Sequence, residues 1–184
     1  DPLELGIQPL LGCALMTLKG QAAPEVGKAY ERARQLCPTD SPEQFGVTLG
    51  LWRHTFIAGH LDRSLELGEQ CFTLAKQTSQ PALLGHAHYA LAGTLMYQGK
   101  LEKALTHADA GLADYRSLKK QGGTEALRHS QDPSATLMAY RAWILFFMGY
   151  WDQAVAGMNE LFELEVVRSH PQTTVTSLTY SGIL

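Results

Sequence analysis

The segment "GKLEKAL", Gly99–Leu105, decides the fold because similar segments recur along the chain. "GHLDRSL" begins at Gly59, "GYWDQAV" begins at Gly149, and a looser copy, "GQAAPEV", begins at Gly20. The intervals between successive glycines are 39, 40 and 50 residues. Self-similarity at such a period is typical of helical repeat proteins, in which each repeat stacks on its neighbours. Gly99 therefore marks one repeat among four.

The two glycines of "GTLMYQGK" also invite comparison with a phosphate-binding loop, but the spacing excludes one. Five residues separate Gly93 from Gly99 where the nucleotide loop has four, and Leu101 follows Lys100 where that loop has Ser or Thr. The spacing matters because backbone amides must surround the phosphates while the hydroxyl binds magnesium. We therefore expect no nucleotide at this point and assign Gly99 to a turn.

Apolar residues after each glycine follow a helical period, at offsets of 0, 3, 4, 7 and 11. Segments of helical length also precede the glycines, so each repeat is predicted to be helix, glycine turn, helix. Glycine suits the turn because it adopts positive φ without a Cβ clash. Small residues recur one turn into each second helix, where the two helices must approach closely. The matching residues are Leu61, Ser64, Leu65, Gly68 and Phe72; Leu101, Ala104, Leu105, Ala108 and Leu112; and Trp151, Ala154, Val155, Met158 and Phe162.

Proline-containing breakers separate the repeats, since proline ends one helix and begins the next. The pattern of a glycine at the turn and an alanine in the second helix resembles the tetratricopeptide repeat. The copies in this sequence are longer than that repeat's usual 34 residues. We expect an all-α fold, a right-handed superhelix (α-solenoid) of tetratricopeptide-like helical hairpins. A single domain, 1–184, would hold repeats at about 3–37, 42–78, 81–119 and 133–169, an insertion at about 116–133, and the first helix of a fifth repeat at 172–184.

An ordered set of motifs extends the resemblance to one family. It comprises "APEVGKAYERARQLC" (23–37), "LGLW" (49–52), "ALLGHAHYALAGTLMYQGKLEKALTHADAGL" (82–112), "QDP" (131–133), "AWILFFMGYWDQAV" (142–155) and "HP" (170–171). The set resembles the C-terminal helical-repeat region of large bacterial signalling ATPases. In that family an adenylate or guanylate cyclase or kinase-like domain and an AAA-type ATPase precede the repeats. The resemblance implies a non-catalytic region of a longer chain, and no active-site residue transfers.

Composition and charge narrow the classes of function. The 184 residues are 45% apolar and 18% charged, with a net charge of -3 and a pI near 6.2, so neither nucleic acid nor an anionic membrane is favoured as partner. The sequence has no run of eighteen apolar residues and does not open with a basic segment followed by an apolar one, so we expect neither a membrane span nor a signal peptide. Three widely spaced cysteines favour a reducing cytoplasm over a disulfide framework. His86 and His88, two apart on a helix, point to different faces, so we expect no metal and no cofactor.

A candidate binding surface lies on the first helices, whose inward faces line the groove of a solenoid. Tyrosine, tryptophan and arginine dominate binding hot spots, and the glycine register places several of them there. We expect Tyr89, Tyr97 and Tyr140 to be exposed, and Trp143, Phe146 and Phe147 to favour the core. The candidate groove residues are Arg53, His86, Tyr89, Tyr97, Tyr140 and Trp143.

The insertion carries a second candidate, a basic cluster at Lys119, Lys120 and Arg128, joined by Arg116. Such a cluster would meet an acidic segment or a phosphate, although exposed charge runs are more often simply solvated.

Together these features predict a scaffold for protein–protein or intramolecular interaction that regulates signalling or ATPase domains of a longer chain. The partner would be a protein or peptide segment, including domains upstream in the same chain. A small-molecule sensor with an aromatic-lined groove is the alternative, from the aromatic run 140–151. The final segment, 172–184, lacks a second helix, so we also expect association of copies through an uncapped solenoid end.

Overall fold

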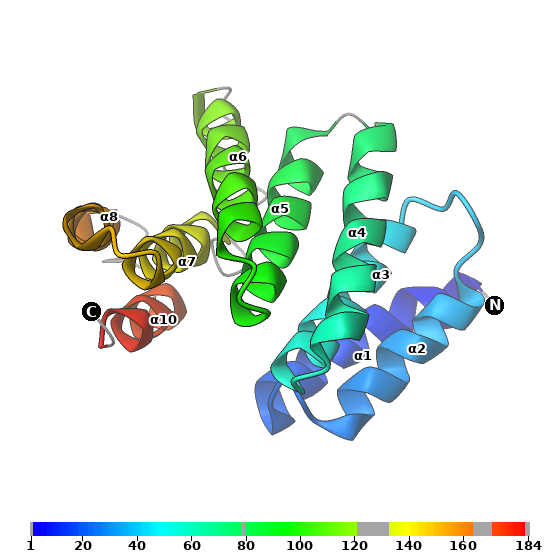
Figure 1. Cartoon of the computed structure of the whole chain (residues 1–184). Helices are drawn as coiled ribbons and strands as arrows, with labels where there is room; N and C mark the ends of the chain where they lie inside the picture. Colours follow the sequence, from blue (N-terminus) through cyan, green and yellow to red (C-terminus); the bar gives the residue numbers. More distant parts are fainter. Residues whose placement is uncertain (1, 79, 121–132, 164–170, 183–184) are drawn as a thin grey trace. The chain divides into compact units, whose positions relative to one another are not determined.

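The structure is a computed structural model that describes residues 2–78, 80–120, 133–163 and 171–182. Every regular element in these ranges is an α-helix. The chain divides into two compact units, Asp1–Ser79 (unit 1) and Gln80–Leu184 (unit 2), and each is described by itself (Figure 1).

Unit 1 consists of two helical hairpins. Helix α1 (Pro2–Lys19) pairs with α2 (Pro24–Leu36), and α3 (Gln44–Ile57) pairs with α4 (Leu61–Thr78). The hairpins contact each other through α2 and α3, and α1 also contacts α3. Helix α3 is therefore enclosed by three neighbours, which explains why its apolar residues surround it instead of forming one stripe.

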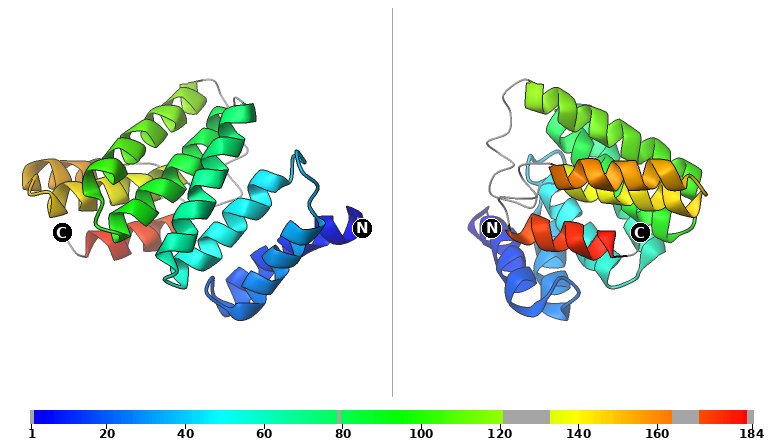
Figure 2. Two further views of the ribbon diagram at one scale, coloured as in Figure 1. Left: turned by 45° about the vertical axis from the view of Figure 1, so that its right-hand side comes forward. Right: turned by 90° about the vertical axis from the view of Figure 1, so that its left-hand side faces the viewer.

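Unit 2 repeats this arrangement and adds one helix. Helix α5 (Pro81–Tyr97) pairs with α6 (Leu101–Lys120), and α7 (Pro133–Phe147) pairs with α8 (Trp151–Glu163). Helix α10 (Pro171–Ser181) packs on α7 and touches α8 (Figure 2). Helices α5, α7 and α10 each begin at a proline, whose fixed φ and missing N–H suit the first helical position.

The glycine turns have the conformation that the repeats predict. Gly59, Gly99 and Gly149 have φ of 82°, 73° and 88°, so the predicted positive φ is confirmed. In each turn the backbone amide of the residue after the glycine donates a hydrogen bond to the carbonyl oxygen five residues before it. This is the hydrogen bond of the Schellman motif. These bonds are Lys100 to Leu95 at 2.9 Å, His60 to Thr55 at 2.9 Å and Tyr150 to Leu145 at 2.8 Å.

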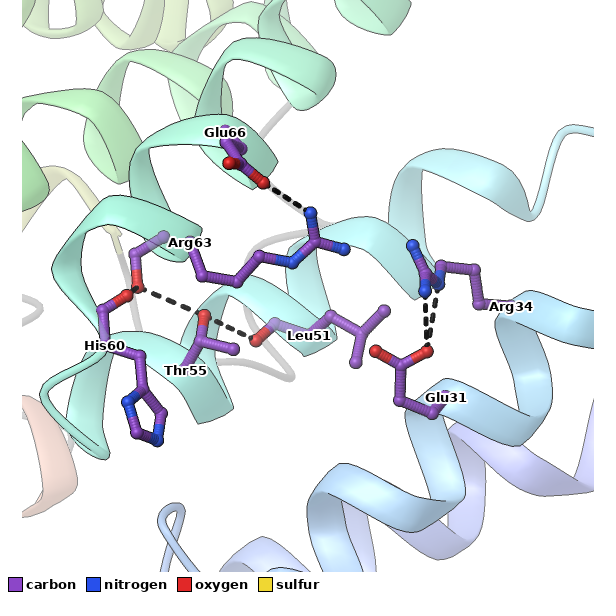
Figure 3. Close-up of polar contacts among 8 residues, drawn as sticks. Glu31, Arg34, Leu51, Thr55, His60, Arg63 and Glu66 are labelled. Carbon is purple, nitrogen blue, oxygen red and sulfur yellow. Dashed lines mark hydrogen bonds and ion pairs between the residues drawn. The ribbon is translucent and has the colours of Figure 1, made fainter.

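The predicted close approach of paired helices is confirmed at Ser64, Ala104 and Ala154, each with no exposed surface. The hydroxyl of Ser64 lies 2.9 Å from the carbonyl oxygen of His60 and 3.1 Å from the hydroxyl of Thr55. Thr55 in turn donates to the carbonyl oxygen of Leu51 at 3.0 Å (Figure 3). This serine is thus small enough for the contact and keeps its polar atom satisfied.

The helical pattern after Gly149 begins with an exposed residue. Trp151 is 51% exposed, whereas Ala154, Met158 and Leu161 are buried. Trp151 is the first residue of α8, where the chain has only just left the turn, and its ring lies against Phe146 with centroids 5.4 Å apart. The buried face of this helix therefore starts one turn later than the pattern indicates.

The core of unit 1 contains one unusually close contact between helices. The ring of Tyr30, which is 4% exposed, lies between Gly12 of α1 and Gly50 of α3. A Cβ built on either glycine would come within 3.0 Å of that ring. The two missing side chains therefore make the space that the tyrosine fills.

Among the helices that the structure describes, none combines the length and the apolar character needed to cross a membrane.

Candidate functional site

Five aromatic residues from the first helices of unit 2 gather into one cluster, called here the aromatic face. They meet because α5 and α10 both pack on α7. The members are Tyr89 and Tyr97 of α5, Tyr140 and Trp143 of α7, and Tyr180 of α10.

Tyr140 is the centre of the aromatic face. The ring of Tyr89 stacks on it, with parallel planes and centroids 5.7 Å apart. The ring of Tyr180 meets it edge-on at 5.4 Å and 89°, and the two hydroxyls lie 3.4 Å apart. Offset stacking and edge-to-face contacts are the favoured arrangements of aromatic pairs and each adds about 0.5–1.5 kcal/mol beyond area burial.

Trp143 fixes α10 against α7. Its indole Nε1–H donates to the backbone carbonyl oxygen of Tyr180 at 2.7 Å, and its ring meets that of Tyr180 at 4.8 Å and 76°. Trp143 is 8% exposed, so the prediction that it favours the core is confirmed. A buried indole N–H needs a partner, and the last turn of α10 supplies one.

The expectation that Tyr140 is exposed is wrong, since only 1% of it is accessible. Gly93 of α5 explains the difference, because a Cβ there would lie 2.7 Å from Cε2 of the Tyr140 ring. The neighbour that approaches Gly93 is thus this side chain. Tyr140 is therefore the buried base on which the accessible side chains of the aromatic face pack, and a partner would contact those side chains instead of Tyr140.

Two tyrosines of the aromatic face and a neighbouring phenylalanine are accessible. Tyr97 is 51% exposed and Tyr89 is partly exposed, in agreement with expectation. Phe147, expected to favour the core, is 54% exposed and packs edge-on against Trp143 at 6.3 Å. Accessible aromatic rings resting on a buried aromatic base are well suited to bind another chain.

Burial raises the pKa of three hydroxyls of the aromatic face, those of Tyr140, Tyr180 and Tyr97. Desolvation raises the pKa of Tyr140 well above its usual value, and the negative charges of ionised Tyr89 and Tyr180 would raise it further. Desolvation also raises the pKa of Tyr180, to about 12, and that of Tyr97. At neutral pH these three tyrosines therefore offer apolar rings and neutral hydroxyl groups, without formal charge.

The other two candidate groove residues are not members of this cluster. Arg53 belongs to α3 in unit 1, where its charge favours the ionised form of Tyr30. His86 precedes Tyr89 by less than one turn of α5, but its Nδ1 lies 2.8 Å from the carbonyl oxygen of Ala82 and its ring contacts Tyr115 of α6. Both positions stay predictions as parts of a binding surface.

The predicted basic cluster cannot be placed, since Arg128 and the side chains of Lys119 and Lys120 lie outside the described residues.

Tyr180 is the member that sequence reasoning missed. The first helix of a fifth repeat is predicted at 172–184, but the register of the marker glycines is applied only to the helices before Gly59, Gly99 and Gly149. It therefore assigns no groove-facing position to α10. Its aromatic residue and the "TSLTY" segment around it are the only local signals of an inward-facing position.

The described residues offer neither an activated cysteine nor a metal site of three or more side-chain ligands. Burial raises the pKa of the Cys71 thiol to about 12, so this cysteine is a small apolar side chain of α4 and no ready nucleophile. In the portion of the chain that is described, no cluster of three or more His, Cys, Asp or Glu residues could hold a metal ion.

Comparisons with known proteins support the fold. No family model matches the chain, and no curated protein sequence matches it. Among solved structures it is similar to a kinesin light chain-like protein of Podosopora anserina with nearly identical TPR-like repeats, at a TM-score of 0.64 and 16% identity, over 100% of this chain and 89% of that one. A single-residue variant of that protein matches with the same TM-score and identity, over 97% and 87%. The chain thus has an all-α, tetratricopeptide-like α-solenoid fold.

Proposed function

We propose that this region is a non-catalytic scaffold that binds a protein segment on the aromatic face of unit 2. The observation that carries the proposal is the arrangement of Tyr97 and Tyr89, accessible on a base formed by buried Tyr140 and Trp143. Stacked helical hairpins present extended surfaces suited to peptides and helices. Rigid aromatic side chains supply contact area at small entropic cost because only two side-chain torsions must be fixed.

The test is selection of binding peptides from a displayed random library, with unchanged wild-type protein as bait. Tyr97→Ala should then weaken binding of the selected peptides by about 5–30-fold, the equivalent of about 1–2 kcal/mol for a hot-spot residue. Tyr150→Ala is the matched control, because Tyr150 is 49% exposed and lies outside the aromatic face. Equal losses for both variants, or no loss for Tyr97→Ala, would contradict the proposal.

Tyr140→Ala is a poor probe of binding. Removal of a fully buried aromatic ring costs about 3–5 kcal/mol of folding free energy, so lost binding would report lost structure. Tyr89→Phe is more informative, since it keeps the stacked ring and removes only the hydroxyl.

The partner proposed first is a segment of the same polypeptide. This finer step rests on the resemblance to the repeat region of bacterial signalling ATPases, in which such binding would regulate a cyclase, kinase-like or ATPase domain. Measured in a full-length protein, Tyr97→Ala should change the basal activity of the upstream domain, whereas Tyr150→Ala should not. The three cysteines are free thiols, and a reducing cytoplasm is the proposed compartment.

The alternative function is sensing of a small apolar molecule. The parallel stacking of Tyr89 on Tyr140 favours it, since a planar ligand would extend that stack. A metabolite that raises the melting temperature of the wild type but not of Tyr89→Ala, with no selected peptide, would support sensing over peptide binding.

Association of copies through the C-terminal end is also proposed. Val175 and Leu178 of α10 are 62% and 56% exposed. Covering that apolar surface with a second copy would remove it from water. Sedimentation should show a concentration-dependent dimer that Leu178→Lys abolishes, and a monomer at high concentration would contradict this part.

A further inference from the structure

Two histidines meet across the α5–α6 hairpin. The Nδ1 atoms of His88 and His107 lie 2.9 Å apart, with ring centroids 5.1 Å apart and planes inclined by 46°. Gly111 of α6 permits this approach, because a Cβ there would lie 2.8 Å from the Cβ of His88. Both imidazoles are partly buried.

A carboxylate lies on the far side of the pair. Oδ2 of Asp114 is 3.9 Å from Nε2 of His88. Its negative charge favours the tautomer of His88 with hydrogen on Nε2, which leaves a lone pair on Nδ1. His107 then donates from its own Nδ1, as the 2.9 Å separation requires.

Neutral imidazoles are the form that binds metal ions. The hydrogen bond between the two Nδ1 atoms requires one nitrogen to accept, so at least one ring of the pair is neutral. Asp114 is the carboxylate that the structure places beside His88.

We propose that His88 and His107 together chelate one divalent transition-metal ion through their Nδ1 atoms, with Cu(II) bound most tightly. Metal–imidazole bonds are about 2.0–2.1 Å long, so two nitrogens 2.9 Å apart subtend an angle of about 90° at the ion. That angle is the one between neighbouring ligands in tetragonal Cu(II) and Ni(II) complexes, and it is narrower than tetrahedral Zn(II) prefers.

Binding requires a tautomeric change and a rotation of the two rings. His107 moves its hydrogen from Nδ1 to Nε2, which frees the second lone pair and releases no proton at neutral pH. Both imidazoles then turn so that the two Nδ1 lone pairs, which lie along the hydrogen bond in the metal-free pair, converge on the ion. The Asp114–His88 arrangement then has the carboxylate–histidine–metal order that orients metal ligands. Water fills the remaining positions, since the described residues hold no third ligand at this place.

The test is titration of the whole chain with Cu(II), Ni(II) and Zn(II), followed by thermal unfolding and, for Cu(II), by electron paramagnetic resonance. A saturable one-to-one signal with nitrogen coupling is expected, with affinity in the order Cu(II), Ni(II), Zn(II). His88→Gln or His107→Gln should each weaken Cu(II) binding at least tenfold. Asp114→Asn should weaken it by about 10-fold, as loss of a supporting carboxylate does.

His60→Gln is the control, because His60 is an exposed histidine in the turn before α4. Its loss should leave the one-to-one site unchanged. The inference is overturned if Cu(II) gives no saturable signal, if the two pair variants bind as the wild type does, or if His60→Gln weakens binding as much. Circular dichroism of each variant verifies folding. Because the site needs both imidazoles, one variant of the pair that folds is enough for the test.

Discussion

The ring of Tyr30 shows how a missing side chain determines packing at the scale of single residues. Gly12 and Gly50 border its two edges, and the phenol also meets the sulfur of Cys13 at 3.2 Å. Burial raises the pKa of this phenol, so it stays protonated at neutral pH. The contact ties α1, α2 and α3 together, and its tolerance to added atoms should therefore be small.

Gly50→Ala should destabilise unit 1. The new methyl would overlap the Tyr30 ring, and overpacking of this kind costs about 1–3 kcal/mol. Gly46→Ala on the same helix is the matched control, because a Cβ there meets nothing within 4 Å. It should be neutral or stabilising within about 1 kcal/mol. Urea unfolding of the two variants measures the difference, and equal midpoints would show that the Tyr30 ring moves aside freely.

His107 should make the free energy of unfolding depend on pH, with lower stability in acid. Its pKa is near 6.5 in the unfolded chain and about 4 in the folded one, chiefly through desolvation. The folded state thus resists a proton that the unfolded state accepts. Stability should be complete above about pH 6.5, fall as the pH drops towards 4, and change little from this source below it. Melting temperatures across that range measure the slope, which His107→Gln should reduce and His60→Gln should not.

At the scale of the element, the hairpin turn is governed by local stereochemistry. Gly59, Gly99 and Gly149 share one conformation and one hydrogen-bond pattern, and open space surrounds the missing Cβ of each. A local cause of this kind is visible in the sequence, which is why the turns and the proline-led helix starts could be predicted. The exposure of Trp151 could not be predicted in this way, because the residue at which a helix begins to be buried depends on the helices packed against it.

Gly99→Ala tests the turn directly. With φ at 73° and nothing within 4 Å, the cost is purely conformational, about 1–2 kcal/mol for a residue with a Cβ. Gly157→Ala in the interior of α8 has the same free space without the positive φ, and should stabilise by about 0.5–1 kcal/mol. Thermal unfolding should move the two melting temperatures in opposite directions. A shift of the same sign in both would show that strain at the turn is relieved.

At the scale of the whole molecule, the candidate site depends on contacts between distant segments. Tyr140 is buried because its ring packs against Gly93 and Tyr180. These residues lie 47 positions before it and 40 positions after it in the sequence. The repeats predict which helices carry aromatic residues. They do not predict which ring covers which, since that depends on the register of α10 and on the close pairing of α5 with α7. His107 escaped notice for the same reason, being 19 residues from His88.

The two compact units lead to a prediction about where a mutation is felt. Destabilisation by Gly50→Ala should speed amide hydrogen exchange in α1–α4 and leave exchange in α5–α8 unchanged, because the added methyl disturbs only unit 1. Mass spectrometry of exchanged peptides measures both halves in one experiment. Faster exchange throughout would show that the units unfold together.

The contact between Trp143 and Tyr180 also gives the protein a built-in optical reporter. At 4.8 Å between ring centres, light absorbed by Tyr180 passes to the indole before the phenol can emit. The share of Trp143 emission that Tyr180 sensitises therefore depends on whether α10 is docked on α7. In a variant without the other two tryptophans, Trp52 and Trp151, the transfer that Tyr180→Phe removes would follow arrival and departure of α10 without any attached dye.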